Sequence, residues 1–421
     1  MTAALPRHRS GTADVVVTDA RGEPLRDEVV HVEQRSHAFG FGNIGFELLR
    51  MVGGPDPDGA EAVESFGGAA EIDPDRFQAQ WLRLFNTATL PFYWGRYEPV
   101  RNRTDEARLR RTAAWLVARG VRVKGRPLVW HTVQPDWLLD LPEAEVEALL
   151  RERIRTLVRG FAGTIDLWDA INEAVIMPVF TNGRNAVTPL AQRKGRVGMV
   201  RLAVEEARAA NPDARLVIND FDLSAAYERL VEEVLDAGIP IDAIGLQTHM
   251  HKGYRGEDAI LGTVDRFSRF GLPIQMTEST LVSGHLMPGH IEDLNDYRVP
   301  EWPSTPEGEA RQADEVERHY RSLFGHPAVE SLTSWGLTDA GSWLGAPVGF
   351  VRADGTEKPS YAVLDRLINE EWRFPAADLR TDRDGRLEIT GPRGAYTVAG
   401  ARGTGAFDID GAAATTKVVV E

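Results

Sequence analysis

The feature of this sequence that most restricts its fold is a regular alternation of short apolar runs with amphipathic segments, from about residue 37 to residue 372. The apolar runs have the length and composition of buried strands, and the segments between them repeat apolar residues at helical spacing. The runs begin at residues 37, 84, 123, 165, 215, 243, 273 and 331, and the clearest helical segments span residues 106–119, 144–159, 198–210, 225–236 and 308–324. Gly120 and Gly238 follow two of these segments, where a left-handed residue commonly ends a helix. Eight such repeats predict an α/β fold, the TIM (β/α)8 barrel.

Both ends of the chain carry a different, β-like pattern. Residues 14–18 and 28–33 are predicted as two strands on either side of a turn, and residues 386–390 and 396–399 form similar runs separated by glycine-rich turns. We therefore expect three parts: an N-terminal β extension at residues 1–36, a catalytic barrel at residues 37–372, and a small C-terminal β appendage at residues 373–421.

The composition excludes several classes of protein. Acidic residues outnumber basic ones by 63 to 48, and the net charge of −15 provides no positive field to attract nucleic acid. No stretch approaches the roughly 20 apolar residues that span a bilayer, and a chain without cysteine forms no disulfide or thiolate metal site. The N-terminus lacks the apolar run of a secretion signal, so we expect a cytoplasmic protein, or a secreted one whose signal has been removed. The oligomeric state is left open by the sequence.

Polar residues gather at the carboxyl ends of the predicted strands, where barrel enzymes build their active sites. The set consists of Trp130 and His131, Asn172 and Glu173, Asn219 and Asp220, Gln247 and His249, Glu278, and Trp335 with Asp339. Two glutamates among them indicate a glycosidase, because cleavage needs one carboxylic acid to protonate the leaving oxygen and one carboxylate to attack or to activate water. His249 and His251 have a metal-like spacing, but no third ligand motif accompanies them. We predict no metal and no other cofactor.

Five motifs resemble, in order and spacing, those of glycoside hydrolase family 10, the xylanase family among the retaining barrel glycosidases. The motifs are Leu128–His131, Trp168–Ala174, Ile244–His249, Met276–Glu278 and Ser334–Trp343, and together they cover the barrel from about residue 37 to residue 370. The resemblance implies that Glu173 is the general acid/base, on the fourth strand, and that Glu278 is the nucleophile, on the seventh. A retaining outcome predicts carboxyl groups about 5–5.5 Å apart.

Further residues are predicted to bind the sugar. Asn172 is placed to hydrogen-bond the 2-hydroxyl of the sugar that is cleaved, and the resemblance puts His249 within hydrogen-bond reach of Glu278. Indole faces stack on pyranose rings, so we expect Trp130, Trp335 and Trp343 to form the walls of the site. The other predicted substrate-binding residues are Arg126, His131 and Gln247, and Asp339 is expected beside the sugar or behind it.

Three departures from the family pattern change the expected sugar site. Xylanases of the family usually carry a Glu-Asn-x-Met-Lys segment after the second strand, which contacts the non-reducing sugar units, and residues 85–99 lack it. Arg126 stands where a histidine is usual, and Thr280 where an aspartate is usual. A site that loses hydroxyl-binding groups loses the substrate that needs them. We therefore expect an altered glycone site, in which residues 90–94 offer an apolar, aromatic surface and Arg126 a fixed positive fork.

Several functions are compatible with this sequence. The leading one is a retaining β-glycosidase, xylanase-like but with an altered glycone site. The alternatives are a glycosidase or transglycosidase acting on β-glycosides with an apolar aglycone, and a catalytically weak carbohydrate-binding barrel. The expected partner is a carbohydrate or glycoside in each case. The long stretch from Ser279 to Glu307, which holds His285, His290, Tyr297 and Trp302, is expected to form a lid or an aglycone wall.

Overall fold

The computed structural model describes residues 5–54, 72–410 and 415–420. The outer ends of the two predicted β extensions, residues 1–4, 411–414 and 421, lie outside the described residues, as do residues 55–71. Contacts within the chain divide it into two compact units, one of residues 41–361 and one of residues 1–40 together with residues 362–421.

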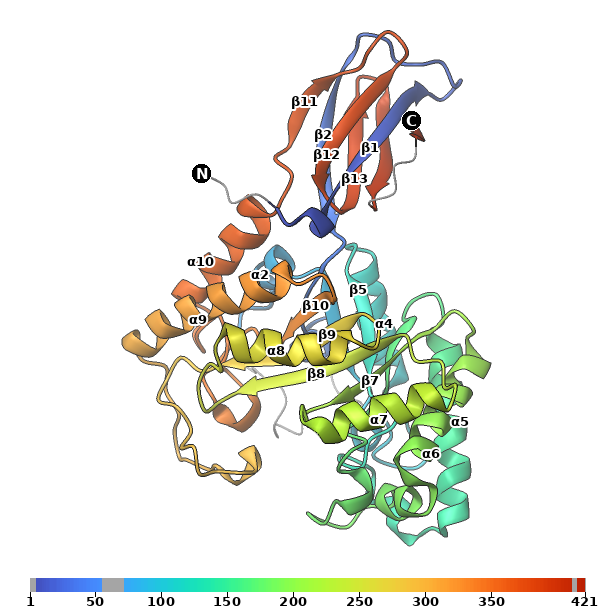
Figure 1. Ribbon diagram of the computed structural model, residues 1–421, viewed down its shortest axis with the longest axis vertical. Coiled ribbons are helices and arrows are strands. Elements are labelled where there is room, and N and C mark those ends of the chain that lie inside the picture. The colour runs from blue at the N-terminus through green and yellow to red at the C-terminus, as the bar shows by residue number, and fades with distance from the viewer. Residues whose placement is uncertain (1–4, 55–71, 411–414, 421) are drawn as a thin grey trace. The chain divides into compact units, whose positions relative to one another are not determined.

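The larger unit contains a closed barrel of parallel strands in the order β10, β3, β4, β5, β6, β7, β8, β9; five of them, β5, β7, β8, β9 and β10, are labelled in Figure 1. These strands are β3 (Gly40–Ile44), β4 (Thr87–Pro91), β5 (Arg122–Arg126), β6 (Leu167–Asn172), β7 (Arg215–Asp220), β8 (Ala243–Met250), β9 (Ile274–Leu281) and β10 (Val329–Ser334). Each of the eight predicted apolar runs overlaps one of them, and the predicted barrel is confirmed. Every residue of β9 is buried, as expected for a parallel strand covered on both faces.

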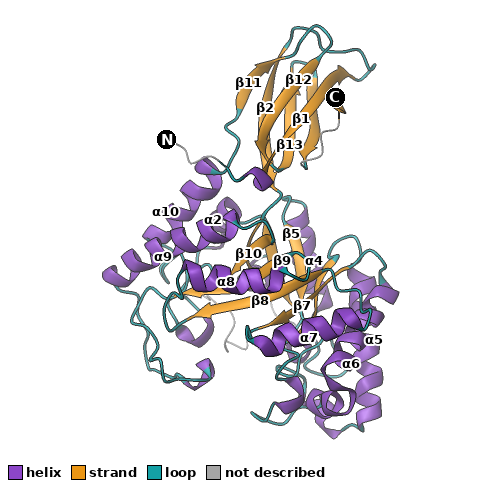
Figure 2. Ribbon diagram, in the orientation of Figure 1, coloured by secondary structure: helices purple, strands orange, loops and turns teal. Residues whose placement is uncertain are grey.

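Helices lie around these strands (Figure 2). They are α1 (Phe46–Met51), α2 (Pro74–Leu84), α3 (Trp94–Tyr97), α4 (Glu106–Val117), α5 (Glu143–Phe161), α6 (Val187–Ala210), α7 (Ala225–Asp236), α8 (Glu257–Ser268) and α9 (Pro306–Gly325), with short 3-10 helices η2 (Asp136–Asp140), η3 (Met177–Val179), η4 (Leu294–Asp296) and η5 (Trp343–Gly345). Helix α10 (Pro359–Arg366) begins in the larger unit and ends in the smaller one. Gly120 and Gly238 have positive φ values of 74° and 67°, as predicted for residues that end helices. Helix α6 begins before the predicted segment and is interrupted at Gly195, where φ is 72°. No helix among the described residues is long and apolar enough to cross a membrane.

The smaller unit joins the two ends of the chain. It holds a sheet of order β12-β1-β15 and a sheet of order β11-β2-β13-β14, and the N-terminal and C-terminal strands lie side by side (Figure 1). The strands are β1 (Ser10–Asp19), β2 (Val29–His37), β11 (Ala377–Arg380), β12 (Arg386–Pro392), β13 (Gly394–Gly400), β14 (Gly403–Ile409) and β15 (Thr415–Val420), with the short helix η1 (Arg7–Arg9) before β1 and a single π-helical turn at Leu367–Glu371. Strand β1 pairs with both β12 and β15, and side chains of both sheets share one apolar core. The two predicted extensions therefore form one unit.

The barrel positions the candidate site because its parallel strands all end at the same face. Asn172 at the end of β6 pairs with Asn219 on β7, and Gln247 on β8 pairs with Glu278 on β9. Residues that lie far apart in the sequence are thereby brought to one end of the barrel.

Candidate active site

The two glutamates lie at two different strands of the barrel, β6 and β9. Glu173 is the first residue after β6, and it adopts a positive φ of 58° while its backbone N–H donates to the carbonyl oxygen of Asn219 at 2.8 Å. A non-glycine residue in this region is uncommon, and such backbone strain is often found at functional sites. Glu278 lies within β9 and is only 3% exposed.

Asn172 connects the two carboxyl groups. Its amide nitrogen donates to Glu173 Oε1 at 3.0 Å, and its amide oxygen accepts from Gln247 at 3.1 Å and from Asn219 at 2.9 Å. Gln247 also donates to Glu173 Oε1 at 3.4 Å, and Asn219 also donates to Glu278 Oε1 at 3.2 Å. Both glutamates are therefore held around a single buried asparagine, where they can face one bound sugar.

The surroundings of Glu173 favour its protonated form. Burial is the main cause that raises the pKa of its carboxyl group, and the nearby charge of Glu278 raises it further. A hydrogen bond from Trp130 Nε1 at 2.8 Å opposes this, and the resulting pKa is about 7. A carboxylic acid that keeps its proton near neutral pH suits the role of a general acid.

The surroundings of Glu278 favour its ionised form. Burial alone would raise the pKa of this carboxyl group, but the positive charge of Arg126 and the hydrogen bonds from His249 and Asn219 outweigh it, and the pKa falls below its ordinary value. Arg126 Nη2 donates to Oε1 of Glu278, and His249 Nε2 lies 3.2 Å from Oε2. The surroundings of the two glutamates thus favour different protonation states, as double displacement requires.

Arg126, predicted to bind substrate, is 2% exposed and is directed toward protein groups. Besides Glu278 it contacts Tyr93 OH through Nη1 at 3.1 Å, Asn172 through Nη2 at 3.2 Å, and Asp169 through Nε at 3.3 Å. Its guanidinium carbon also lies 4.6 Å from the ring centre of Trp335. The guanidinium group that was expected to bind the sugar is therefore bonded to side chains of the protein itself.

Sequence reasoning missed Asp169, a buried partner of this arginine, and Lys124, which pairs with the same carboxylate. Lys124 Nζ lies 2.6 Å from Asp169 Oδ1, and both side chains are at most 5% exposed. A signal was present, because Lys124 and Arg126 are two residues apart on one strand and so point to the same face.

Aromatic side chains surround the pair. Ile44, Phe46, Tyr93 and Trp335 form a buried cluster against which Trp130, Val133 and Trp343 pack. The ring of Trp343 lies 4.7 Å from the ring of His249. The three tryptophans predicted to wall the sugar site thus lie together at this end of the barrel.

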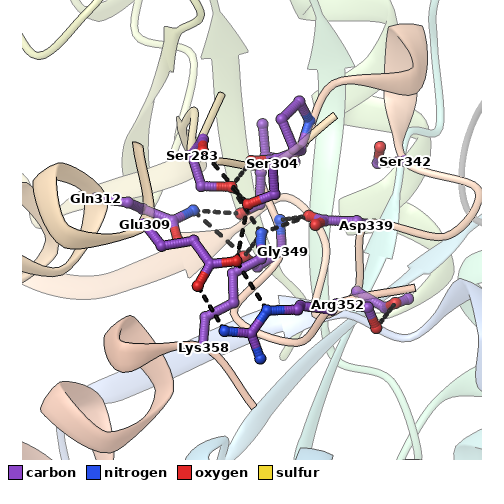
Figure 3. Close-up of polar contacts among 12 residues, drawn as sticks. Ser283, Ser304, Glu309, Gln312, Asp339, Ser342, Gly349, Arg352 and Lys358 are labelled. Carbon is purple, nitrogen blue, oxygen red and sulfur yellow. Dashed lines mark hydrogen bonds and ion pairs between the residues drawn. The ribbon is translucent and has the colours of Figure 1, made fainter. Parts of the chain in front are cut away.

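Two predicted site residues lie outside the web of hydrogen bonds around the glutamates. His131 is 1% exposed, its ring packs 4.3 Å from that of Phe180, and its Nδ1 has no hydrogen-bond partner in the part of the chain that the structure describes. Burial lowers the pKa of His131 to about 4, so its ring is neutral near pH 7. Asp339 accepts from Lys358 Nζ at 2.7 Å and from the backbone N–H of Gly349 at 3.0 Å (Figure 3).

The expectation of an exposed aromatic surface at residues 90–94 is wrong. Leu90, Phe92, Tyr93 and Trp94 are at most 7% exposed. This segment ends an interior barrel strand and enters α3, so its apolar side chains pack inward. Only Tyr93 among these four reaches the ion pair of Arg126 and Glu278 through a hydrogen bond.

The stretch from Ser279 to Glu307 is folded on itself. Trp302 is 6% exposed, its indole stacks on His285 at 5.3 Å, and its Nε1 donates to the carbonyl oxygen of His285 at 2.8 Å. Tyr297 packs edge-on against Trp302 at 4.9 Å. His251 lies between this loop and the site. The centre of its ring is 6.0 Å from that of Trp302 and 5.3 Å from that of Trp343. The loop therefore packs against one wall of the candidate site.

No group of three or more His, Cys, Asp or Glu side chains that could hold a metal ion occurs within residues 5–54, 72–410 and 415–420. His249 and His251 instead both approach the hydroxyl of Thr280, through Nδ1 at 3.5 and 3.3 Å.

A closed barrel with two glutamates of different ionisation preference at its carboxyl end is the arrangement of a glycoside hydrolase. The profile of Glycosyl hydrolase family 10 matches residues 83–366, more than half of the sequence. The chain belongs to this family. It is a glycoside hydrolase similar to the endo-1,4-β-xylanases.

Individual relatives are distant. The chain is 26% identical over 322 residues to endo-1,4-β-xylanase B of Thermotoga neapolitana, covering 72% of this chain and 86% of the relative. It is 30% identical over 321 residues to endo-1,4-β-xylanase C of Paenibacillus barcinonensis, covering 65% of this chain but only 28% of the relative. A solved structure of GH10 from Paenibacillus barcinonensis superposes with a TM-score of 0.60 at 23% identity, over 79% of this chain and 95% of that one. This last likeness shows the fold.

Proposed function

We propose that the protein hydrolyses β-glycosides by double displacement, with Glu173 as general acid/base and Glu278 as nucleophile, and that its glycone site differs from that of its xylanase relatives. The main support is the shared web around Asn172, which holds a protonated and an ionised carboxyl group beside each other.

The proposed reaction has two steps. A carboxylate oxygen of Glu278 bonds to the anomeric carbon while the bond from that carbon to the leaving oxygen breaks, and the proton of Glu173 moves to the leaving oxygen. Water then bonds to the anomeric carbon, its proton moves to Glu173, and the ester bond to Glu278 breaks. The configuration at the anomeric carbon is retained because it is inverted twice.

The altered glycone site is supported by the segment that follows β4. In place of the polar residues expected of a xylanase, this segment brings Tyr93 to the site, and the hydroxyl of Tyr93 already accepts from Arg126. Phe46 and Val133 pack in the same cluster as Tyr93, and Val133 adopts a positive φ of 46°. A β-branched residue with this φ is a true outlier. An apolar, closely packed wall here favours a glycone other than a chain of xylose units.

A second candidate, action on glycosides with an apolar aglycone, is favoured by exposed apolar side chains beyond the acid. Val179 in η3 is 61% exposed, and Phe221, the first residue after β7, is 46% exposed. A pocket of about 360 Å³ is lined in part by Leu138, Leu141 and Phe180, the residue that follows Val179. Apolar groups exposed near an active site commonly bind apolar parts of a ligand.

A substrate screen tests these proposals. Turnover is measured on xylan, xylo-oligosaccharides and aryl β-glycosides of xylose and glucose, with Glu278→Ala and Glu173→Ala as inactive variants. Glu205→Ala is the control, because Glu205 is an exposed glutamate on α6 whose side chain is 57% accessible. We expect aryl glycosides to be turned over better than xylan; efficient xylan cleavage with poor aryl glycoside turnover would reject the altered glycone site.

Two further measurements separate the alternatives. Product analysis with an alcohol acceptor distinguishes hydrolysis from transfer. If the wild-type protein only binds carbohydrate, it will leave a 2,4-dinitrophenyl glycoside intact. That result would contradict the proposed reaction.

A further inference from the structure

The nucleophile belongs to a chain of four buried charges. Lys124 and Arg126 on β5 alternate with the carboxylates of Asp169 on β6 and Glu278 on β9. The side chains of all four are at most 5% exposed. We call this set the Arg126 network.

The network is electrically balanced only while Glu278 is ionised. Two positive and two negative groups then sum to zero, whereas protonation or esterification of Glu278 leaves one positive charge in excess. Burial makes such an excess costly, because buried charges are little screened by water. Arg126 is the member that faces this change, because its Nη2 donates to Glu278 Oε1.

We infer that Arg126 is a positioning residue that keeps Glu278 ionised in the free enzyme and, after the glycosyl ester has formed, favours loss of the proton from Glu173. The inference rests on the proposed double displacement. It also changes the role of Arg126 from the predicted substrate binding to positioning. The guanidinium group contacts Tyr93, Asn172 and Asp169 as well as Glu278, and so it is already bonded to protein groups.

The effect of Arg126 on Glu173 follows from its ion pair with Glu278. When the ester forms, the negative charge of Glu278 disappears. Asp169 is then the carboxylate that remains in ion-pair contact with Arg126. Arg126 already lowers the pKa of Glu173, and Glu278 raises it. Loss of the charge of Glu278 removes one of the causes that raise this pKa, so the pKa of Glu173 falls and Glu173 can act as a base at the step in which water must be deprotonated.

Other polar groups also face the two carboxyls. Glu278 is approached by His249 from β8 and Asn219 from β7, and the phenol of Tyr93 lies across Arg126. Glu173 is faced by Trp130 and Gln247, and the buried carboxyl of Asp220 is near it. Arg126 is the group among these whose charge is permanent, so its removal has a distinct effect on pH dependence.

The test uses Arg126→Met and the pH dependence of kcat/KM on 2,4-dinitrophenyl β-glycosides of xylose and glucose. These substrates need no protonation of the leaving group, so the acid limb reports ionisation of Glu278. We expect this limb to move upward by about 1–3 pH units, the usual influence of an adjacent opposite charge. Arg126→Lys keeps a charge and should return the acid limb most of the way to its wild-type position.

A buried arginine away from the carboxylates is the matched control. Arg153 on α5 is 7% exposed, donates to the carbonyl oxygen of Phe92, and lies over the rings of Trp94 and Tyr97. Arg153→Met should lower thermal stability as any loss of a buried arginine does, yet leave the acid limb in place. An equal shift in both variants would overturn the inference.

A second measurement covers variants that turn over too slowly or fold poorly. Labelling by 2,4-dinitrophenyl 2-deoxy-2-fluoro-β-glycosides of xylose and glucose is followed by intact mass across pH, because ester formation itself requires ionised Glu278. The double variant Arg126→Met with Asp169→Asn removes one charge of each sign, and should fold better than Arg126→Met while still showing the shifted limb. Labelling with an unshifted pH dependence in either variant would contradict the role of Arg126.

The outcomes separate this inference from the proposed function. If Glu278→Ala and Glu173→Ala retain wild-type turnover, the double displacement itself is wrong. If they are inactive while Arg126→Met shows an unshifted acid limb, the reaction stands and the role of Arg126 is wrong.

Discussion

Two buried ion networks in the barrel unit use similar groups in different ways. In the Lys358 network (Ser283, Asp339, Gly349 and Lys358), Lys358 Nζ donates to Ser283 Oγ at 2.8 Å, to Asp339 Oδ1 at 2.7 Å and to the carbonyl oxygen of Gly349 at 2.8 Å (Figure 3). Its three protons each have an acceptor. In the Arg126 network, Arg126 Nε and both carboxylate oxygens of Asp169 lie at ion-pair distance but make no hydrogen bond of normal geometry with any described residue.

We infer from this difference that the Lys358 network is a structural ion pair and that the Arg126 network takes part in the proposed reaction. A satisfied network holds one arrangement, and here it ties the loop after β9 to the segment before α10. An incompletely satisfied network keeps charges close without fixing them fully, so its balance can change when Glu278 becomes an ester. Buried polar groups that lack partners in native proteins are often found where function requires them.

The largest effect is expected at the carboxyl group on which the Arg126 network acts. Glu173→Gln should lower kcat by roughly 10²–10⁴-fold on glycosides with poor leaving groups, because general acid catalysis is lost. The wild-type enzyme needs protonated Glu173, whose pKa is about 7, so its kcat/KM should fall as pH rises above this value. The basic limb should be absent in the variant. A full pH profile of both proteins measures this, and a basic limb that persists in Glu173→Gln would assign it to another group.

The next effect should appear in stability alone. Lys358→Met leaves Asp339 buried without its cation, which destabilises by about 3–5 kcal/mol. Urea unfolding measures this, and kcat/KM profiles should keep both limbs where they are in the wild type. The double variant with Asp339→Asn removes both charges and should recover part of the loss. If Lys358→Met shifted the acid limb as Arg126→Met is expected to do, the two networks would not differ in the way proposed.

The barrel could be predicted from the sequence because its signal is local and repeated. Each strand and helix carries its own periodicity, and the glutamates stand in motifs at strand ends. Pairing between β1 and β12 has no such signal, because the two strands lie at opposite ends of the chain and either could form a separate extension. The burial of residues 90–94 was missed for a related reason: an apolar run looks the same whether it faces solvent or a neighbouring element. Contacts such as Lys358 with Asp339 depend on loop geometry, which a pattern of residue types does not specify.

A buried carboxyl group without a cation provides a third case between the two networks. Glu47 on α1 is 4% exposed, its Oε2 has no hydrogen-bond partner among the described residues, and burial raises its pKa from 4.5 to about 7. A carboxyl whose pKa is higher in the folded state contributes stability below pH 4.5 that is lost as pH rises toward 7. We expect Glu47→Gln to remove about 2–3 kcal/mol of this pH dependence. Calorimetric unfolding of both proteins at pH 5 and pH 8 measures it, and an equal pH dependence in the two would show that Glu47 has a partner in solution.

The smallest effect should come from the edge of the Lys358 network. Ser304 Oγ lies 2.7 Å from Ser283 Oγ and donates to Glu309 Oε1 at 3.1 Å (Figure 3). Ser304→Ala removes these contacts, yet Ser283 keeps Lys358, and Glu309 keeps Arg352 at 2.8 Å. We therefore expect a loss of about 1 kcal/mol, the usual contribution of one hydrogen bond.

Ser322→Ala is the control for this last variant, because the hydroxyl of Ser322 bonds a helix carbonyl at an exposed position on α9. Its unfolding free energy should change less than that of Ser304→Ala. A loss at Ser304 as large as that of Lys358→Met would mean that the hydroxyls, and not the buried charge, hold this network together. The contrast with the Arg126 network would then rest on the number of hydrogen bonds alone.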